Sequence, residues 1–138
     1  MNAKEFLLQI RKYDNLIQNK LEEIYMLKEK AKMPGGSLSS NEKVKATKQI
    51  DVMQCAIVDY VQKEEELQAE ISRYWEKRAE VIQCIEKMKN VEYDLLHKVY
   101  VQGKTLDEVA YINDKSYSWA TTVHGRAIKN LQAILDAA

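Results

Sequence analysis

Proline and glycine are scarce in this chain, whose 138 residues include one proline and four glycines. Both residue types interrupt regular structure, so their scarcity allows long helices and disfavours a β-fold with frequent turns. The chain also lacks a long uninterrupted apolar run, and we expect neither a signal peptide nor a membrane-spanning segment. The sequence therefore predicts an all-α protein with no membrane partner.

An excess of charge of either sign is also missing, because 21 Lys and Arg side chains balance 21 Asp and Glu. A strongly basic chain would favour nucleic acid as a partner, and this balance does not supply that argument. The segment from Glu92 onward is mixed in the same way. Any nucleic-acid-binding surface must therefore come from the local arrangement of side chains.

The sequence contains none of the short motifs that mark common enzyme and metal sites. Cys55 and Cys84 stand far apart in one predicted helix, so they cannot pair within it, and we expect free thiols. No CxxC or HExxH spacing and no glycine-rich phosphate loop occurs. We predict no cofactor, no metal and no enzymatic activity.

Helical periodicity is the strongest positive signal. Over residues 2–32 the apolar side chains recur at steps of three and four, which predicts a helix with one apolar face. These residues are Phe6, Ile10, Tyr13, Ile17, Leu21, Ile24, Leu27 and Ala31. A Pro-Gly-Gly sequence then predicts a loop over 33–41, and Ser39 with Glu42 matches the capping box of a following helix.

The segment from Asn41 to about Lys89 has the most regular pattern. Its positions step by four and three without a break, as in a coiled coil, and its only charged members are Glu64 and Arg78, which we expect to fix the register or the oligomeric state. The members are Ala46, Ile50, Met53, Ile57, Tyr60, Glu64, Leu67, Ile71, Tyr74, Arg78, Val81, Ile85 and Met88. Residues 1–90 are therefore predicted to form a coiled-coil hairpin of two long helices.

The second helix of this hairpin is longer than the first. We expect its far end, near Tyr74 to Met88, to need another cover for its apolar seam. The C-terminal domain and a second copy of the chain are the two candidates. A homodimer through the long second helix is therefore a hypothesis.

Residues 91–138 are predicted to form a separate domain of three shorter helices. The first, about 92–102, places Leu96, Val99 and Tyr100 on one face and ends at Gly103. The second begins at Thr105, which forms a capping box with Glu108. Its apolar face is Leu106, Val109 and Ala110, and it ends near Asn113 and Asp114.

The third helix begins with Ser116 or Ser118 as N-cap. Its apolar face consists of Ala120, Val123, Ala127, Leu131 and Ile134. A short helix, a tight turn and a longer helix with a polar start are the layout of a helix-turn-helix. Such a motif presents the first turns of its second helix to the major groove, so small or polar residues are needed there. The outward set is Tyr117, Ser118, Thr121 and Thr122.

Two stretches resemble the helix-turn-helix of sigma factor region four: Gly103-Lys-Thr-Leu-Asp-Glu-Val-Ala110 and His124-Gly-Arg-Ala-Ile-Lys-Asn-Leu131. With the opening Met-Asn-Ala-Lys-Glu-Phe-Leu and the long second helix, nearly the whole chain is similar to a phage and prophage family of Gram-positive bacteria. The members of that family are sigma-like or late transcription regulators. The resemblance implies a cytoplasmic regulator of phage genes in a bacterial host cell that binds double-stranded DNA, with RNA polymerase as a candidate partner.

The resemblance also implies roles for individual residues. Tyr117, Ser118, Thr121 and Thr122 would face the bases, and Lys104, Lys115, Arg126 and Lys129 would lie along the phosphates. Family members often carry Arg, Lys or Gln at the positions of Trp119, Thr121 and Thr122. Because Arg and Gln make the bidentate base contacts, we predict weak intrinsic affinity for DNA.

Two residues near this motif have other interpretations. We expect Trp119 to be a partly buried packing residue, with the alternative that its aromatic face stacks on a base or touches a thymine methyl. We expect His124 to be solvated, to cap a helix or to touch phosphate. The alternative function is a coiled-coil protein-interaction module, for example one that binds RNA polymerase, whose helix-turn-helix no longer contacts DNA. A purely structural coiled coil would explain the first 90 residues but not the C-terminal pattern.

Overall fold

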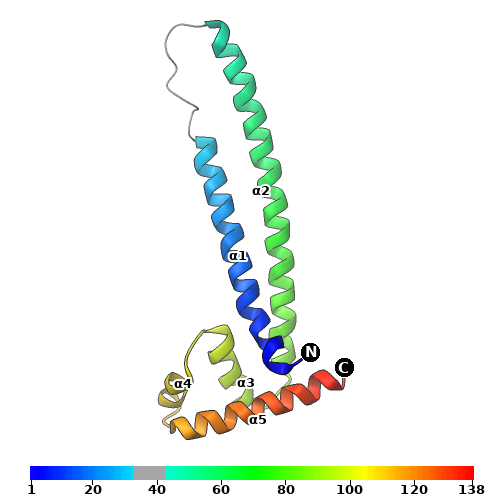
Figure 1. Cartoon of the computed structure of the whole chain (residues 1–138), viewed down its shortest axis with the longest axis vertical. Coiled ribbons are helices and arrows are strands. Elements are labelled where there is room, and N and C mark those ends of the chain that lie inside the picture. The colour runs from blue at the N-terminus through cyan, green and yellow to red at the C-terminus, as the bar shows by residue number, and fades with distance from the viewer. Residues whose placement is uncertain (33–42) are drawn as a thin grey trace. The chain divides into compact units, whose positions relative to one another are not determined.

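The computed structural model describes residues 1–32 and 43–138, and within them the side chains of residues 1–31 and 58–138 (Figure 1). This part of the chain is helical and contains no strand, which confirms the all-α prediction for it. Its elements are α1 (Ala3–Lys32), α2 (Lys43–Glu86), α3 (Asn90–Leu96), the π-helical segment η1 (His97–Val101), α4 (Leu106–Ile112) and α5 (Tyr117–Asp136). The predicted loop and its capping box lie outside the described residues.

Two compact units divide the chain. One unit is continuous and runs from Leu16 to Arg73. The other combines residues 1–15 with residues 74–138, and we call it the two-segment unit. The helices that follow residue 90 therefore share a unit with the first turns of α1 and the last turns of α2, whereas the sequence pattern suggested a boundary at residue 90.

In the continuous unit, α1 and α2 run antiparallel. Lys20 Nζ lies 2.9 Å from a carboxylate oxygen of Glu70, and Lys28 Nζ lies 3.9 Å from a carboxylate oxygen of Glu64. The residue numbers of the partners on α2 therefore decrease as those on α1 increase, as in an antiparallel pair. Lys20 lowers the pKa of the Glu70 carboxyl through its hydrogen bond and its charge. Ile24 and Leu67 are buried between the two ion pairs, and Ile17 and Ile71 are buried beyond the Lys20–Glu70 pair.

One part of the predicted apolar face of α1 is not buried. Leu21 is 48% exposed, and Ala31 is exposed as well. Ile17 and Ile24 are seven residues apart and lie on one line along the helix, whereas a step of four places Leu21 to the side of that line. The apolar face predicted for this helix is therefore buried only in part. The first four members of the α2 seam, Ala46 to Ile57, lie outside the described side chains.

The far end of α2 is covered by its own chain. In the two-segment unit Arg78 Nε donates to Asp14 Oδ1 at 2.6 Å, and the rings of Tyr13 and Tyr74 stack with centroids 6.1 Å apart. Farther along α2, Val81 and Ile85 are buried in the core of the unit. Of the two covers expected for this seam, the same chain supplies one, so the uncovered seam no longer argues for a homodimer.

The core of the two-segment unit draws residues from every helix in it. Its buried members are Ala3, Leu7, Ile10, Val81, Ile85, Leu95, Leu96, Tyr100, Val109, Ala110, Ala120, Val123, Ala127 and Leu131. Polar contacts also join the chain start to α5: the Ala3 amide donates to Gln132 Oε1 at 2.7 Å, and Gln132 Nε2 donates to the Met1 carbonyl. Asn2 caps α1, since its Oδ1 accepts from the Lys4 amide at 2.8 Å.

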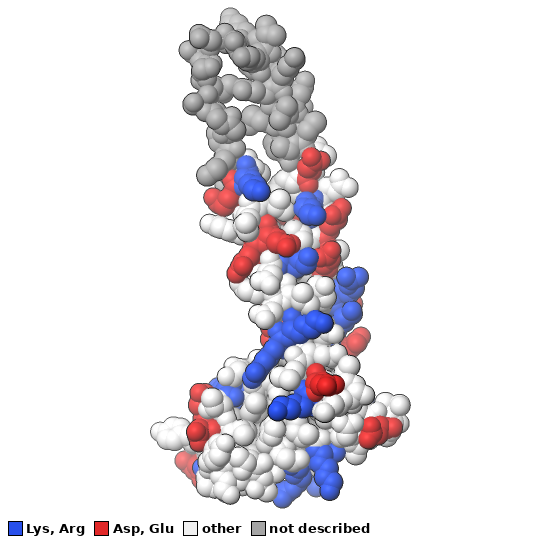
Figure 2. Space-filling model, viewed as in Figure 1, with Lys and Arg blue, Asp and Glu red and all other residues white. Residues whose placement is uncertain are grey.

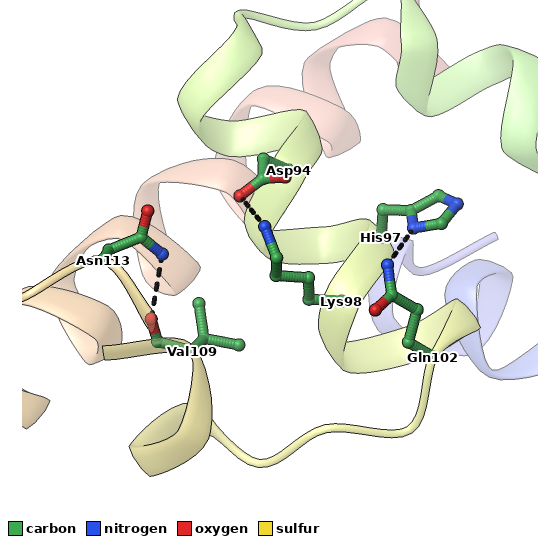
Figure 3. Close-up of polar contacts among 6 residues, drawn as sticks. All are labelled: Asp94, His97, Lys98, Gln102, Val109 and Asn113. Carbon is green, nitrogen blue, oxygen red and sulfur yellow. Dashed lines mark hydrogen bonds and ion pairs between the residues drawn. The ribbon is translucent and has the colours of Figure 1, made fainter. Parts of the chain in front are cut away.

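The segment predicted as one helix over 92–102 is two elements. After α3 the chain widens into η1, where the Gln102 amide donates to the His97 carbonyl five residues earlier at 3.0 Å. Figure 3 shows the Gln102 side chain reaching His97 Nδ1 across this wide turn, beside the Asp94–Lys98 ion pair. Gly103 follows at φ +74°, so the prediction of a left-handed cap at that glycine is confirmed.

Candidate functional site

Side-chain hydrogen bonds cap the first turns of both α4 and α5. Thr105 Oγ1 accepts from the Glu108 amide at 3.2 Å and so caps α4. Ser116 Oγ accepts from the Trp119 amide at 3.1 Å and caps α5. Of the two serines proposed as the cap, the structure selects Ser116, and both caps agree with the sequence prediction.

The turn between α4 and α5 closes on a left-handed residue. Asp114 has φ +54°, and its amide donates to the Tyr111 carbonyl while the Lys115 amide donates to the Ala110 carbonyl. This pair of bonds is the Schellman arrangement, with aspartate where glycine is more usual. Asn113 Nδ2 adds a bond to the Val109 carbonyl at 2.9 Å, visible in Figure 3. These hydrogen bonds therefore fix the backbone conformation of the turn that joins α4 to α5.

One face of α5 is anchored in the core of the two-segment unit. Ala120, Val123, Ala127 and Leu131 are buried, as the sequence pattern predicts, and Ile134 is half-buried. The two alanines are small, which lets α5 approach the helices beneath it closely. Glu92 on α3 is buried beside α5, and its Oε1 accepts from Asn130 Nδ2 at 2.8 Å. No sequence pattern indicated this hydrogen bond, which joins residues 38 positions apart.

The opposite face of α5 is exposed and uncharged. Tyr117 is 55% exposed, and Ser118, Thr121 and Thr122 are exposed as well. From Tyr117 to Gly125 the helix has no Lys, Arg, Asp or Glu. Figure 2 shows mainly uncharged side chains where α5 begins at the lower left of Figure 1. All four residues predicted to face a partner therefore lie together on one accessible face, which we call the α5 face.

Two hydroxyl groups of the α5 face are bonded within the helix. Thr121 Oγ1 and Thr122 Oγ1 both donate to the Ser118 carbonyl, at 2.9 and 2.8 Å. A hydroxyl has one hydrogen, so each side chain keeps only its methyl group and its oxygen lone pairs for another molecule. The sequence did not indicate this arrangement.

The four predicted phosphate contacts do not form one group. Arg126 and Lys129 are exposed on α5, four and seven residues after Thr122, so they continue the side of the helix that Thr122 occupies. Lys115 is exposed in the turn that precedes α5. Lys104 is half-buried and stands before α4, at the end of that helix away from the turn. The structure thus places Arg126 and Lys129 next to the α5 face on the same helix and Lys104 at the far end of α4.

His124 is packed rather than solvated. Its Nε2 lies 2.9 Å from the Tyr100 hydroxyl, and the two rings stack with centroids 5.9 Å apart. Burial, together with the nearby positive charge of Lys4, lowers the pKa of His124 below the usual 6.5. Burial also raises the pKa of the Tyr100 hydroxyl. Lys4 therefore brings a positive charge close to α5, although nothing in the sequence connected it to that helix.

Trp119 is half-buried and packs against the core, which confirms the expected packing role. It also lines a small pocket of about 240 Å³ between the start of α3 and the turn before α5. The other lining residues are Asn90, Val91, Asp94, Leu95, Asn113 and Lys115. Because Trp119 lies in this pocket wall, it is not a member of the α5 face.

Neither a metal site nor a known relative points to another function. Among the residues with described placement, no three His, Cys, Asp or Glu side chains gather where a metal ion could be held. In the same part of the chain no helix is long and apolar enough to cross a membrane. The sequence matches no protein-family model and no curated protein, and no solved structure matches it. The α5 face is the candidate site on its geometry alone.

Proposed function

We propose that this protein is a phage or prophage transcription regulator that binds double-stranded DNA, with α4 and α5 acting as a helix-turn-helix. The observation that carries the proposal is the α5 face: an exposed, uncharged surface on the first turns of a helix whose other side is buried. Major-groove recognition by a helix-turn-helix needs this division of faces. The caps at Thr105 and Ser116 and the closed turn at Asp114 support it.

Basic residues lie where phosphates would flank such a helix. Arg126 and Lys129 extend the α5 face toward the C-terminus, and Lys115 precedes it in the turn. Phosphate contacts fix the position of a recognition helix in the groove without selecting a sequence. Few basic residues are available, so we expect weak binding that depends on salt through a small number of contacts.

The salt dependence of DNA binding tests this proposal. We expect wild-type protein to bind a labelled duplex of about 24 base pairs, slightly over two helical turns, with affinity that falls as salt rises from about 50 to about 200 mM. Arg126→Ala together with Lys129→Ala should weaken binding and reduce the slope of log affinity against log salt by about 2. Fluorescence anisotropy across the salt series gives both quantities.

Lys77→Ala is the matched control, because Lys77 is an exposed lysine on α2 away from the α5 face. It should leave the affinity and the salt slope unchanged. An equal reduction in this variant would show that total charge, rather than α5, governs binding. Absence of binding by wild-type protein at about 50 mM salt would contradict the proposal itself.

Exposed apolar residues beside the turn support a second candidate function, a protein-interaction module. Tyr111 is 85% exposed at the end of α4, and Ile112 next to it is also exposed. Large apolar side chains grouped at a surface are typical of protein interfaces. If this function holds, RNA polymerase is retained by immobilised wild-type protein in the absence of DNA, and Tyr111→Ser with Ile112→Ser releases it.

A further inference from the structure

The two threonines of the α5 face determine what that face can offer to a base pair. Thr121 and Thr122 each use their only hydroxyl hydrogen on the Ser118 carbonyl. Two methyl groups and the lone pairs of two oxygens are left for a partner. The remaining exposed donors are the single hydroxyls of Tyr117 and Ser118.

These groups suit some base edges better than others. In the major groove guanine presents two acceptors, N7 and O6, and these are best met by the paired donors of Arg or Lys. The α5 face has no such residue between Tyr117 and Gly125. Thymine presents a methyl group there, and adenine presents an N–H donor beside N7. Threonine methyls fit the thymine methyl, whereas threonine lone pairs can accept from the amino group of either adenine or cytosine, so the methyl group is what distinguishes the pairs.

We propose that the α5 face binds A·T pairs in the major groove by packing the methyl groups of Thr121 and Thr122 against thymine methyls. This inference rests on the proposed function and adds the class of base pair that the site selects. Arg126 and Lys129 position the helix on the phosphates, and the two threonines provide the selection. Apolar packing of this kind gives a modest preference, because each methyl removes little surface from water.

Removal of the thymine methyl alone tests the inference. Four labelled duplexes of about 24 base pairs serve as probes: alternating A·T, the same duplex with deoxyuridine for thymidine, alternating G·C, and the same duplex with 5-methylcytosine. Uracil lacks only the methyl, and 5-methylcytosine adds a methyl at the same place in the groove. We expect binding to the uracil duplex to be about fourfold weaker for each thymine methyl that packs against a threonine. We also expect tighter binding to the methylated than to the plain G·C duplex.

Thr121→Ser with Thr122→Ser removes the protein's methyl groups and keeps both hydroxyls. This variant should bind thymine and uracil duplexes equally while retaining wild-type helicity by circular dichroism. Thr105→Ser is the matched control, because it makes the same chemical change at the cap of α4, outside the α5 face, and preserves the capping oxygen. It should bind the four duplexes as wild type does.

The outcomes separate this inference from the function beneath it. Equal affinity of wild-type protein for thymine and uracil duplexes, with salt-dependent binding to both, would overturn the methyl packing and leave DNA binding intact. A thymine preference that survives in the Thr121→Ser, Thr122→Ser variant would assign the selection to other residues and overturn the inference as well. No binding to any of the four duplexes at low salt would remove the proposed function and this inference together.

Discussion

Gly103 and Gly125 differ in backbone conformation although both lie near the candidate site. Gly103 has φ +74°, whereas Gly125 lies inside the helix α5. A Cβ added at either position meets no atom within 4 Å, so only the backbone decides the effect of a substitution. Side chains other than glycine adopt the left-handed conformation at a cost of roughly 1–2 kcal/mol, while glycine within a helix costs about 0.5–1 kcal/mol relative to alanine.

We therefore expect substitutions of opposite sign at these two glycines. Gly103→Ala should lower the free energy of unfolding by about 1 kcal/mol, and Gly125→Ala should raise it by about 0.5–1 kcal/mol. Urea denaturation followed by circular dichroism measures both. Each variant is the control for the other, and a change of the same sign in both would contradict the assigned conformations.

His124 makes the stability of the two-segment unit depend on pH. Burial and Lys4 lower its pKa in the folded protein below the 6.5 of an unfolded chain. The unfolded state therefore binds a proton at His124 more readily than the folded state does. The stabilisation that neutral His124 gives to the folded state is fully present above pH 6.5 and is lost as pH falls through the folded pKa. We expect the melting temperature to fall as the pH is lowered from about 7.5 to about 5.5.

His124→Gln isolates this contribution, because glutamine keeps a polar side chain beside the Tyr100 hydroxyl and does not titrate. Carboxyl groups contribute to the pH dependence of both proteins, so the quantity to compare is the difference in melting temperature between wild type and variant at each pH. That difference should shrink or reverse in favour of the variant as pH falls. A constant difference over the range would show that His124 is not the titrating group.

At the residue scale, the sequence predicted the contacts that are local. Thr105, Ser116 and Gly103 act within a few residues of themselves, so their positions in the chain were enough to assign their roles. Contacts between residues far apart in the sequence could not be predicted in this way. The Tyr100–His124 pair and the Glu92–Asn130 pair join residues that only the packing of α5 brings together.

At the scale of the element, α1 shows how far periodicity extends. The pattern predicted a helix with an apolar face that includes Phe6, and α1 is a helix in which Phe6 packs against the core, but the pattern did not include Leu7, which is fully buried. Adjacent apolar positions fit a three-four pattern almost equally well. The first turns of α1 lie in a core that also contains α3 and α5 residues, so burial there extends beyond one stripe.

Leu7 and Leu8 form a matched pair that tests this burial. Leu7→Ala should destabilise the two-segment unit by roughly 2–5 kcal/mol, because it opens a cavity among fully buried side chains. Leu8→Ala makes the same chemical change at a position that is 38% exposed, with a cost expected below about 1 kcal/mol. Thermal denaturation of both variants gives the comparison, and similar destabilisation at the two positions would contradict the placement of α1.

The π-helical segment η1 could not be predicted from the periodicity of apolar residues. Leu96 and Tyr100 are four residues apart and both buried, as an α-helix would require, so the pattern predicted a single helix. The wider turn shows in the backbone, for example in the bond from the Gln102 amide to the His97 carbonyl five residues earlier. A single inserted residue of this kind leaves the apolar pattern on either side nearly unchanged.

At the scale of the whole molecule, the sequence predicted two long antiparallel helices but not their register. Each helix has an apolar seam that repeats every seven residues. Two such seams can therefore pack together in several registers that differ by seven residues. In the structure Arg78 lies beside Asp14 and Lys20 beside Glu70. The far end of α2 therefore meets the start of α1 and the C-terminal helices, which a seam alone does not specify.

The division of the chain into one continuous and one two-segment unit has a consequence for biosynthesis. Residues 1–15 leave the ribosome well before their core partners, which lie in residues 74–138. Residues 16–73 can complete their own contacts in the meantime. At ~5–20 residues per second, Leu7 and Ile10 wait on the order of ten seconds with no core to enter. The apolar side chains that residues 1–15 bury in the folded unit thus stay without their core until the candidate DNA-binding helix has been synthesised.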